Sequence, residues 1–457
     1  MSEVTTTDLY EVTMAMSYLS EGMRAEATFS LFVRDLPPGR GFLVAAGLEP
    51  SLDYLARFEV TAEDARVFAE ALHRPPVDLA PMVGLRFDGE VRGVPEGRLV
   101  FAGEPLLEVT APLPQAQLVE TYLLSQVCHQ TAVASKAARC VLAARGRPVV
   151  DFSLRRNHGP QAGFQAARLG GLVGFAGTSN VDAAVRLGLA ALGTMAHSYI
   201  ESFPSEEEAF RAFARTHTGP VTLLVDTYDT DRGVATAARV LAELRRGPGC
   251  AIRLDSGDLA ELARRSRTRL DAAGLSDVQI VASGGLDEYA IDGLVRSGAP
   301  IDVFAVGTRV GVAADAPYLD AAYKLVAYDG RPVMKLSSAK ATAPAAKQVY
   351  RRPGQPDVIA LRDEAAPPLM EPLLGPVMRN GHRTGPPDAL NAAHSRFEAD
   401  LVALAPEARR IRAPWPPAPT TSERLSRLTG EVRKRLLSQM GDPHGRRVMD
   451  GTPPGDR

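Results

Sequence analysis

The 457-residue sequence has few cysteines, no cluster of histidines and no long apolar run. Its three cysteines, Cys128, Cys140 and Cys250, are widely spaced and form no metal-ligand pattern. We expect free, buried thiols, which suit a reducing compartment. No apolar run is long enough to span a bilayer, and the polar, acidic N-terminus lacks the basic start and apolar core of a signal peptide. These absences predict a cytoplasmic protein with no membrane partner.

The sequence also lacks a strong charge of either sign. Its 52 Lys and Arg residues nearly balance its 54 Asp and Glu residues, which leaves a net charge of −2. This balance gives no reason to expect nucleic acid or another polyanion as a partner. Hydrophobic residues make up 45% of the chain and charged residues 23%, as in ordinary globular proteins, so a large core is available.

Residues 1–112 predict an N-terminal α+β domain. The first helix has Leu9, Val12, Met16 and Leu19 on one apolar face, with Asp8 as its cap. A strand is expected next, and short alternating segments separated by Pro and Gly predict further, antiparallel strands. These strands are expected at Ala27–Val33, Glu90–Val94, Leu99–Phe101 and Leu106–Val109.

Residues 113–320 predict an α/β barrel. After a long helix, Gln115–Arg145, short apolar runs alternate with helical stretches, which is typical of a parallel sheet buried on both faces. Polar or glycine residues follow every run. A barrel has its active site at the ends of its strands, whereas an open dinucleotide-binding sheet would concentrate such signals at one crevice. The apolar runs are Val149-Val150, Leu172–Phe175, Ala190–Leu192, Val221–Val225, Ala251–Leu254, Val278–Ala282 and Val303–Val306.

Residues 321–440 predict a C-terminal extension of strands and helices that packs on the N-terminal domain. Asp329-Gly330 between two alternating segments indicates a type I′ hairpin. More strands are expected at Gln348–Arg351 and Val358–Leu361, followed by helices near residues 386–404 and 422–439. The Gly-, Pro- and Arg-rich residues 441–457 predict a disordered tail.

Two glycine-rich turns at strand ends indicate a phosphate site. Ser283-Gly284-Gly285 and Gly307-Thr308 each follow a predicted strand and open a predicted helix, where backbone N–H groups can hold an anion. One such turn would be an ordinary connection between strand and helix. Two on consecutive strands match the phosphate site that barrels build from their last strands.

Charged residues at other strand ends fit an anionic ligand. Arg155 and Arg156 could grip a phosphate or pyrophosphate, although a solvated basic turn is the alternative. Arg253 stands inside an apolar run, where a charge is costly unless paired. Its partner could be a structural one, Asp255, or an anionic ligand beside that residue.

The remaining candidates are acids and a histidine. Asp226 and Asp255 end strands, where they could hold ribose hydroxyls, Mg²⁺ waters or neighbouring arginines. Asp258 could cap the next helix. His197 follows a strand directly and is either a satisfied polar residue or catalytic. No lysine ends a run, which disfavours a Schiff-base aldolase, and no histidine cluster supports a zinc hydrolase. The residues alone predict a barrel enzyme that acts on a phosphosugar-like anion.

The order of these motifs resembles the nicotinate phosphoribosyltransferase family. The resemblance runs from residue 7 to about 350, with little beyond residue 360. It is carried by Thr7-Asp8-Leu9-Tyr10, Asp151-Phe152-Ser153-Leu154-Arg155-Arg156, Gly177-Thr178-Ser179-Asn180, Gly193-Thr194-Met195-Ala196-His197-Ser198, Val225-Asp226-Thr227-Tyr228-Asp229, Arg253-Leu254-Asp255-Ser256-Gly257-Asp258, Ala282-Ser283-Gly284-Gly285, Gly307-Thr308 and Tyr323-Lys324-Leu325.

The resemblance implies an irregular α/β barrel with an N-terminal α/β domain, in a homodimer with shared active sites. It implies that nicotinate and phosphoribosyl pyrophosphate give nicotinate mononucleotide and pyrophosphate, with coupled hydrolysis of ATP. Mg²⁺ would be bound through the substrate phosphates rather than by protein ligands.

The resemblance also implies roles for individual residues. His197 would be phosphorylated by ATP, with Asp226 and Asp255 as the other catalytic residues. Tyr10 of the partner subunit and Phe152 would sandwich the pyridine ring. The other implied contacts are Arg253 and Thr194 with nicotinate, Arg155 with pyrophosphate, Asp255 with the ribose, and Gly284, Gly285, Gly307 and Thr308 with the 5-phosphate.

Three rival functions remain open at this point. Nicotinamide phosphoribosyltransferases resemble the segment around Ser179 but carry Asp there, so a serine favours nicotinate. A quinolinate enzyme would need several basic residues for two carboxylates, and only Arg253 is placed for one. A catalytically inactive binding protein would not need His197, Asp226 and Asp255 together.

Overall fold

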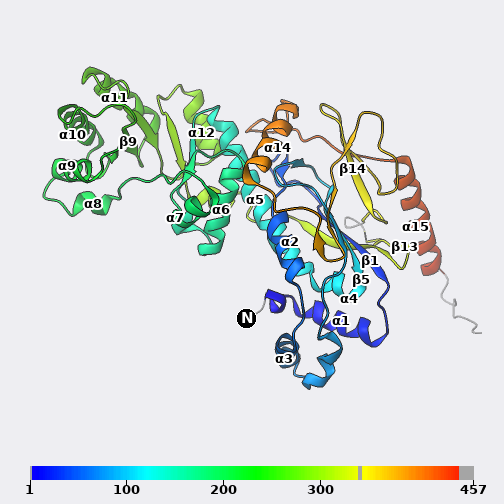
Figure 1. The fold of residues 1–457 in the computed structure, drawn as a ribbon. Coiled ribbons are helices and arrows are strands. Elements are labelled where there is room, and N and C mark those ends of the chain that lie inside the picture. The colour runs from blue at the N-terminus through cyan, green and yellow to red at the C-terminus, as the bar shows by residue number, and fades with distance from the viewer. Residues whose placement is uncertain (1–2, 338–341, 442–457) are drawn as a thin grey trace, which may run out of the picture.

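Two lobes share the chain, and a long helix lies between them. The computed structural model describes residues 3–337 and 342–441. One lobe contains residues from both ends of the chain, and the other contains the α/β units from the middle of the sequence (Figure 1). Helix α5 (Glu120–Ala144) lies where the two lobes meet. Of its 25 residues, 16 are buried, so it acts as a shared core element.

A seven-stranded sheet joins the N-terminal and C-terminal segments in one lobe. From edge to edge its strands are β13 (Arg331–Pro332), β12 (Ala321–Tyr328), β1 (Glu26–Val33), β5 (Pro105–Pro112), β3 (Glu90–Gly93), β17 (Gly375–Arg379) and β18 (His382–Arg383). The hairpin predicted at Asp329-Gly330 is confirmed, because φ is +51° and +68° at these residues. A smaller sheet pairs β2 (Leu43–Val44) with β4 (Leu99–Val100).

Helices of this lobe depart from the expected pattern at two places. In α1 (Leu9–Ser20) the side chains of Val12 and Leu19 are buried, but Leu9 is exposed. Asp8 makes no capping hydrogen bond; its carboxylate instead accepts one from the hydroxyl of Thr121. The single long helix expected at 115–145 is two helices, α4 (Leu113–Leu118) and α5. Two further helices from the N-terminal segment, α2 (Leu48–Arg57) and α3 (Ala62–Ala71), belong to this lobe.

The predicted alternation of strands and helices in the middle of the chain is confirmed, and its parallel sheet, expected as a barrel, forms a half-barrel. Its strands are ordered β7 (Gly177–Thr178), β6 (Val149–Asp151), β11 (Val303–Val306), β10 (Gln279–Ala282), β9 (Ala251–Leu254) and β8 (Thr222–Leu224). A parallel bridge between Thr178 and Ala191 extends the β7 edge. Helices α6 (Pro160–Leu172), α7 (Val181–Leu187), α9 (Glu206–Thr216), α10 (Thr230–Glu243), α11 (Leu259–Ala272) and α12 (Glu288–Arg296) connect the strands.

Two of the seven expected strands are not formed: Ala190–Leu192 contributes only the isolated bridge at Ala191, and Leu172–Phe175 is not a strand. Residues Leu172–Phe175 form the end of α6 and the turn after it, with Gly174 at φ +92°, and the strand is the next pair, Gly177-Thr178. The apolar side chains of Leu172, Val173 and Phe175 are buried all the same, because the end of a packed helix also faces the core.

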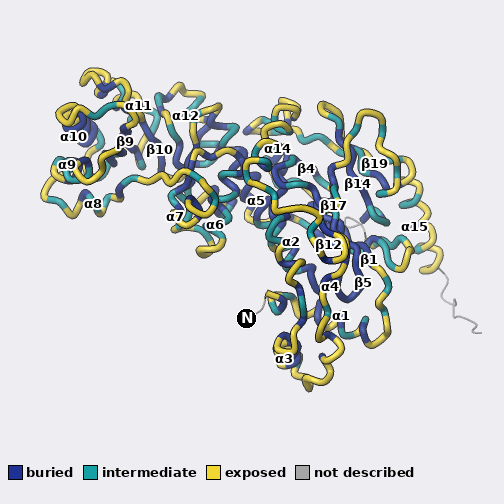
Figure 2. Tube along the Cα trace, in the orientation of Figure 1, coloured by how far each residue is buried: buried dark blue, intermediate teal, exposed yellow. Residues whose placement is uncertain are grey.

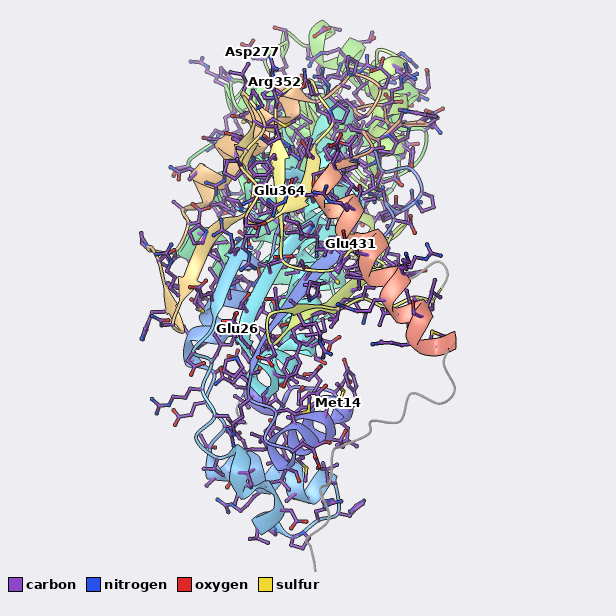
Figure 3. All side chains as sticks on the ribbon, turned by 90° about the vertical axis from the view of Figure 1, so that its right-hand side faces the viewer. Met14, Glu26, Asp277, Arg352, Glu364 and Glu431 are labelled. Atoms are coloured by element: carbon purple, nitrogen blue, oxygen red, sulfur yellow. The ribbon has the colours of Figure 1, made fainter. Side chains whose placement is uncertain are left out.

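A C-terminal sheet and two helices close the first lobe. The sheet is ordered β16 (Glu371–Pro372), β14 (Lys347–Arg351), β15 (Val358–Leu361) and β19 (Thr420–Thr421). Helices α14 (Leu390–Ala403) and α15 (Glu423–Gly441) follow the chain. Figure 3 shows α15 beside this sheet. Glu431 lies on the helix, and Glu364, which follows β15, lies near the upper end of the helix in this view. Apart from Gly441, the tail expected to be disordered lies outside the described residues.

Buried residues follow the seven-stranded sheet, the half-barrel sheet and α5, whereas α3 and α15 are exposed over much of their surface (Figure 2). Among residues 3–337 and 342–441, we find no helix that is both long and apolar enough to cross a membrane.

A buried ion cluster, Arg40, Lys136, Arg139, Glu288 and Asp315, links the two lobes. Glu288, at the first position of α12, lies 2.5 Å from Lys136 Nζ and 2.9 Å from Arg139 Nε on α5. Asp315 pairs with Lys136 at 2.8 Å and in a bidentate manner with Arg40 at 2.7 and 3.0 Å. The side chains of Arg40, Lys136, Arg139 and Glu288 are at most 1% exposed. Burial alone would raise the pKa of Asp315, but Arg40 and Lys136 hold it well below its ordinary value.

We expect Glu288→Ala to lower the free energy of unfolding by about 3–5 kcal/mol, because it leaves buried cations without their partner. Denaturant unfolding followed by circular dichroism measures this. Glu3→Ala is the matched control: Glu3 pairs with Arg57 at 3.1 Å on the surface, so the loss should stay below about 1 kcal/mol. Equal losses in the two variants would contradict a central role for the cluster.

Candidate active site

A cavity of about 590 Å³ opens at the carboxyl ends of the half-barrel strands. Because parallel strands end at the same edge of a sheet, residues far apart in sequence meet there. Seven of the residues expected from the sequence line it. The full lining is Phe152, Arg155, Thr178, Ser179, Val181, Ala191, Leu192, Gly193, Thr194, Met195, Ala196, His197, Leu224, Arg253 and Asp255.

Arg253 is the buried cation of this cavity. It belongs to β9, where its backbone pairs with neighbouring strands while its side chain, 10% exposed, reaches the cavity. Its guanidinium donates to Ser283 Oγ at 2.8 Å, Thr194 Oγ1 at 2.9 Å and Asp255 Oδ1 at 2.6 Å. It also lies 5.6 Å from the centre of the Phe152 ring. The Arg253–Asp255 pair that the sequence left open is therefore present, and both residues still face the cavity.

Asp255 is an ionised carboxylate held by three neighbours. Burial acts to raise its pKa, but the Ser283 hydroxyl, 2.5 Å from Oδ1, and the charge of Arg253 outweigh burial and lower the pKa below its ordinary value. His197 adds to this effect, with Nε2 3.9 Å from Asp255 Oδ2. A carboxylate that stays ionised can accept hydrogen bonds from sugar hydroxyls.

Asp226 supports this arrangement from the neighbouring strand end. Its Oδ2 accepts hydrogen bonds from the backbone N–H of Asp255 at 2.9 Å and from Ser256 Oγ at 2.7 Å. Its Oδ1 is buried and has no hydrogen-bond partner among the described residues. Buried carboxylate oxygens normally have a hydrogen-bond partner. An oxygen without one is therefore a free acceptor at the edge of the site.

His197 begins the short helix α8 (His197–Glu201) and faces Thr227 as well as Asp255. Its Nδ1 lies 3.1 Å from Thr227 Oγ1, which leaves Nε2 directed toward Asp255. The sequence analysis assigned no role to Thr227 or to the side chain of Ser283. Thr227 follows the candidate Asp226, and Ser283 precedes the candidate Gly284. Hydrogen-bond partners of this kind follow from tertiary contact and carry no spacing signal.

The glycine turns lie at the ends of β10 and β11. A side chain at Gly284 would place Cβ 1.8 Å from the carbonyl oxygen of Asp255, and φ there is +87°. Gly285 also has a positive φ, +64°, but nothing within 4 Å. The first turn does not open a helix directly, because α12 begins only at Glu288. Gly307 does precede helical residues, Thr308–Gly311 of α13.

Of the other expected residues, Arg155 and Ser179 line the cavity, whereas Tyr10 does not. Arg155 is exposed at the cavity rim, and the backbone N–H of Ser179 donates to Asp151 O at 2.8 Å. Asp151 itself, to which the sequence assigned no role, is buried and accepts a hydrogen bond from Thr178 Oγ1 at 2.7 Å. Tyr10 does not reach the cavity: α1 lies in the other lobe (Figure 1), and Tyr10 contacts Glu120.

Fold and site together define the class of protein. A parallel half-barrel whose strand ends present arginines, aspartates, a histidine and glycine turns is an enzyme framework for an anionic, phosphorylated small molecule.

Comparison with known proteins identifies the family. The model of the nicotinate phosphoribosyltransferase N-terminal domain matches residues 5–128, and the model of the nicotinate phosphoribosyltransferase family matches residues 148–348. Nicotinate phosphoribosyltransferase pncB2 of Mycobacterium tuberculosis is 44% identical over 444 residues, 96% of this chain and 95% of that protein. The Bacillus subtilis nicotinate phosphoribosyltransferase is 42% identical, covering 78% and 76%. The crystal structure of human nicotinic acid phosphoribosyltransferase superposes with a TM-score of 0.82 at 30% identity, covering 93% and 99%. The chain belongs to the nicotinate phosphoribosyltransferase family.

We expect Gly284→Ala to destabilise the protein by about 3 kcal/mol or more, because the new Cβ overlaps a backbone carbonyl at a positive φ. The matched control is Gly285→Ala, which has open space and should show only the backbone cost of about 1–2 kcal/mol. Denaturant unfolding of the two variants checks this, and equal losses would mean that the close approach to Asp255 is not required.

Proposed function

We propose that the protein is a nicotinate phosphoribosyltransferase that forms nicotinate mononucleotide and pyrophosphate from nicotinate and phosphoribosyl pyrophosphate. The observation that carries this proposal is Arg253, a buried guanidinium in a strand with an aromatic ring, Phe152, beside it. A flat ring with one carboxylate needs a stacking face and a cation fixed at the ring edge. The relatives named above are nicotinate phosphoribosyltransferases, which supports the same substrate.

In this proposal the ring lies against Phe152, and its carboxylate is bound by Arg253 and Thr194. The Thr194 hydroxyl already contacts Arg253, at 2.9 Å, on the cavity side. Ser179 in the cavity is neutral, whereas a carboxylate at this position would repel nicotinate. Nicotinamide, the alternative substrate, is not favoured, because its amide would offer Arg253 no negative charge.

The phosphoribosyl group would bind across the strand ends. Gly284, Gly285, Gly307 and Thr308 follow the ends of β10 and β11, outside the lining of the cavity, and would offer backbone N–H groups to the 5-phosphate. Arg155, in the lining, would contact the pyrophosphate. Asp255 accepts hydrogen bonds from the ribose hydroxyls and, with Asp226, stabilises the positive charge that develops at C1 when pyrophosphate leaves. The ring nitrogen then forms the new bond to C1.

Mg²⁺ would enter with the substrate phosphates and neutralise charge on the departing pyrophosphate. The residues present fit this mode of binding. Among the described residues no three His, Cys, Asp or Glu side chains are grouped to hold a metal by themselves. Asp226 Oδ1, which is buried without a partner, could accept a hydrogen bond from a water of the cation.

ATP would be coupled to this reaction through His197. In the tautomer in which Nδ1–H donates to Thr227 Oγ1, Nε2 would carry the lone pair that attacks the γ-phosphate; an N–P bond forms and the O–P bond to ADP breaks. The ring nitrogen of nicotinate carries no proton that a base would have to remove, so His197 has no use as a general base. Hydrolysis of the phosphohistidine returns the enzyme to its starting state, which makes the protein a phosphoprotein during turnover.

We further propose a homodimer in which the partner subunit's Tyr10 completes the ring site. Within one chain Tyr10 lies in the other lobe and is 45% exposed, so its ring is available to a second copy. Three free cysteines fit the reducing cytoplasm as its location.

The assay that tests the proposed function measures mononucleotide formed from labelled nicotinate or nicotinamide, each with and without ATP. We expect efficient turnover of nicotinate, stimulated by ATP, and little turnover of nicotinamide. Preference for nicotinamide would overturn the substrate assignment, and failure of both substrates would overturn the activity.

We expect Arg253→Ala to raise KM for nicotinate about thirtyfold or more, because a carboxylate in the cavity loses its charged partner, at a cost of about 2–5 kcal/mol. Arg156→Ala is the control, since Arg156 is exposed and does not line the cavity. An unchanged KM for nicotinate in folded Arg253→Ala would contradict the assignment.

We expect His197→Ala to abolish transfer of acid-labile ³²P from γ-labelled ATP while some ATP-independent synthesis survives, because ring and phosphate contacts remain. His217→Ala is the control, because that histidine is exposed at the end of α9 and outside the cavity. Alkaline peptide mapping of the labelled protein locates the phosphate. Label at another residue would overturn this mechanism.

A further inference from the structure

A second cavity, of about 570 Å³, lies in the lobe that contains the two chain ends. It is bounded by β4, by the β14–β15 turn at residues 352–357, by the last turns of α14 and by the segment 415–418. None of its lining residues comes from the half-barrel, so it is separate from the catalytic cavity. Its volume lies in the range of pockets that enclose a small molecule.

The mouth of this cavity carries Trp415, the single tryptophan of the chain. Its side chain is 76% exposed, although an indole would ordinarily be largely buried. The backbone is held in place by a hydrogen bond from the N–H of Trp415 to Glu407 O at 3.0 Å. Pro416 and Pro417 follow and restrict the chain further. The ring is therefore presented on a stiff segment beside a cavity floored by Leu99, Phe101 and Leu404.

Two of the arginines in the lining are already neutralised. Arg98 donates to Asp400 at 2.9 Å and to Glu371 at 2.8 Å. Arg351 donates to Asp400 at 2.9 Å and to Asp357 at 2.5 Å. These ion pairs form a rigid wall. Because both arginines already have carboxylate partners, this wall does not require a charged ligand.

Arg352 differs from these two arginines. It lies at the tip of the β14–β15 hairpin, above the yellow β14 arrow (Figure 3), and lines the same cavity. Within the described part of the chain its guanidinium has no carboxylate within ion-pair distance and no side-chain hydrogen bond. Arg396, the fourth arginine of the lining, pairs with Asp388, so among the described residues Arg352 is the unpaired cation in a cavity that the exposed Trp415 also lines.

We propose that this cavity binds a nucleoside phosphate, with the base stacked on Trp415 and the phosphate bound by Arg352. Stacking on an aromatic ring is open to any base, because every base has a π face. A guanidinium matches phosphate oxygens with two parallel N–H donors. A single-ring acid would leave most of 570 Å³ empty, whereas a nucleoside monophosphate is of the size that such cavities enclose.

Fluorescence of Trp415 tests the proposal directly, because no other tryptophan contributes to the signal. AMP is the probe, and the full chain is titrated in the presence of saturating phosphoribosyl pyrophosphate, so that binding at the catalytic cavity is separated from binding here. We expect a saturable change in emission. Adenosine, which lacks the phosphate, and ribose 5-phosphate, which lacks the base, should each bind at least about tenfold more weakly.

Matched variants assign the contacts. Arg352→Ala should weaken AMP binding about tenfold or more, whereas Arg156→Ala, at an exposed arginine outside this cavity, should leave it unchanged. Variants of Trp415 lose the fluorescence signal, so their binding of labelled AMP is measured by equilibrium dialysis. Trp415→Phe keeps a stacking face and should bind AMP, whereas Trp415→Ala should not.

Three results would overturn the proposal. The first is no saturable change up to millimolar AMP. The second is a change that Arg352→Ala leaves intact. The third is a fluorescence change that depends on protein concentration alone, with association seen by sedimentation, which would mean that a second copy of the chain covers this face. None of these outcomes bears on the proposed transferase activity, which depends on the other cavity.

Discussion

Glu288 and Asp315 pair with three cations, Arg40, Lys136 and Arg139, where the two lobes meet, and these ion pairs hold the two lobes together. Arg40 comes from a loop of the N-terminal segment, Lys136 and Arg139 from α5, and the two acids from the segments that follow the glycine turns. Arg139 also donates to the carbonyl of Ile411 at 2.6 Å, which brings in the C-terminal segment. Because each charge is costly to bury alone, the cluster is satisfied only when all these segments are in place. That requirement fixes where the half-barrel sits against the rest of the chain.

The ion cluster also restricts the geometry of the candidate active-site cavity. Glu288 begins α12 three residues after Gly285, and Asp315 follows α13, which begins at Thr308. Both glycine turns are thus tied to α5 on one side and to strand ends on the other. Gly284 packs against the backbone carbonyl of Asp255, so the turn and the end of β9 cannot move independently. A site that binds a small molecule in one orientation benefits from such rigid support.

Local chemistry could be predicted wherever a short stretch decides its own conformation. The hairpin at Asp329-Gly330 was predicted because only a few residues adopt two successive positive φ angles cheaply. Asp258 caps α11 through hydrogen bonds to the N–H groups of Ala260 and Glu261, as its position indicated. Leu172–Phe175 was misassigned because buried helix ends and buried strands are both apolar. Asp8, a plausible cap by sequence, instead contacts Thr121, which is 113 residues away.

The sequence by itself determined the alternation of strands and helices, the polar residues at the strand ends and the family to which the chain belongs. These depend on periodicity, turn chemistry and motif order, which are properties of neighbouring residues. Only the tertiary structure decided that Arg253 contacts Ser283, Thr194 and Asp255 together, that Thr227 orients His197, and that Tyr10 lies in the other lobe. It also decided that Arg352 and Trp415 line one cavity. Such pairings arise from long-range packing, in which the partner of a side chain is chosen by the whole fold and leaves no spacing signal in the chain.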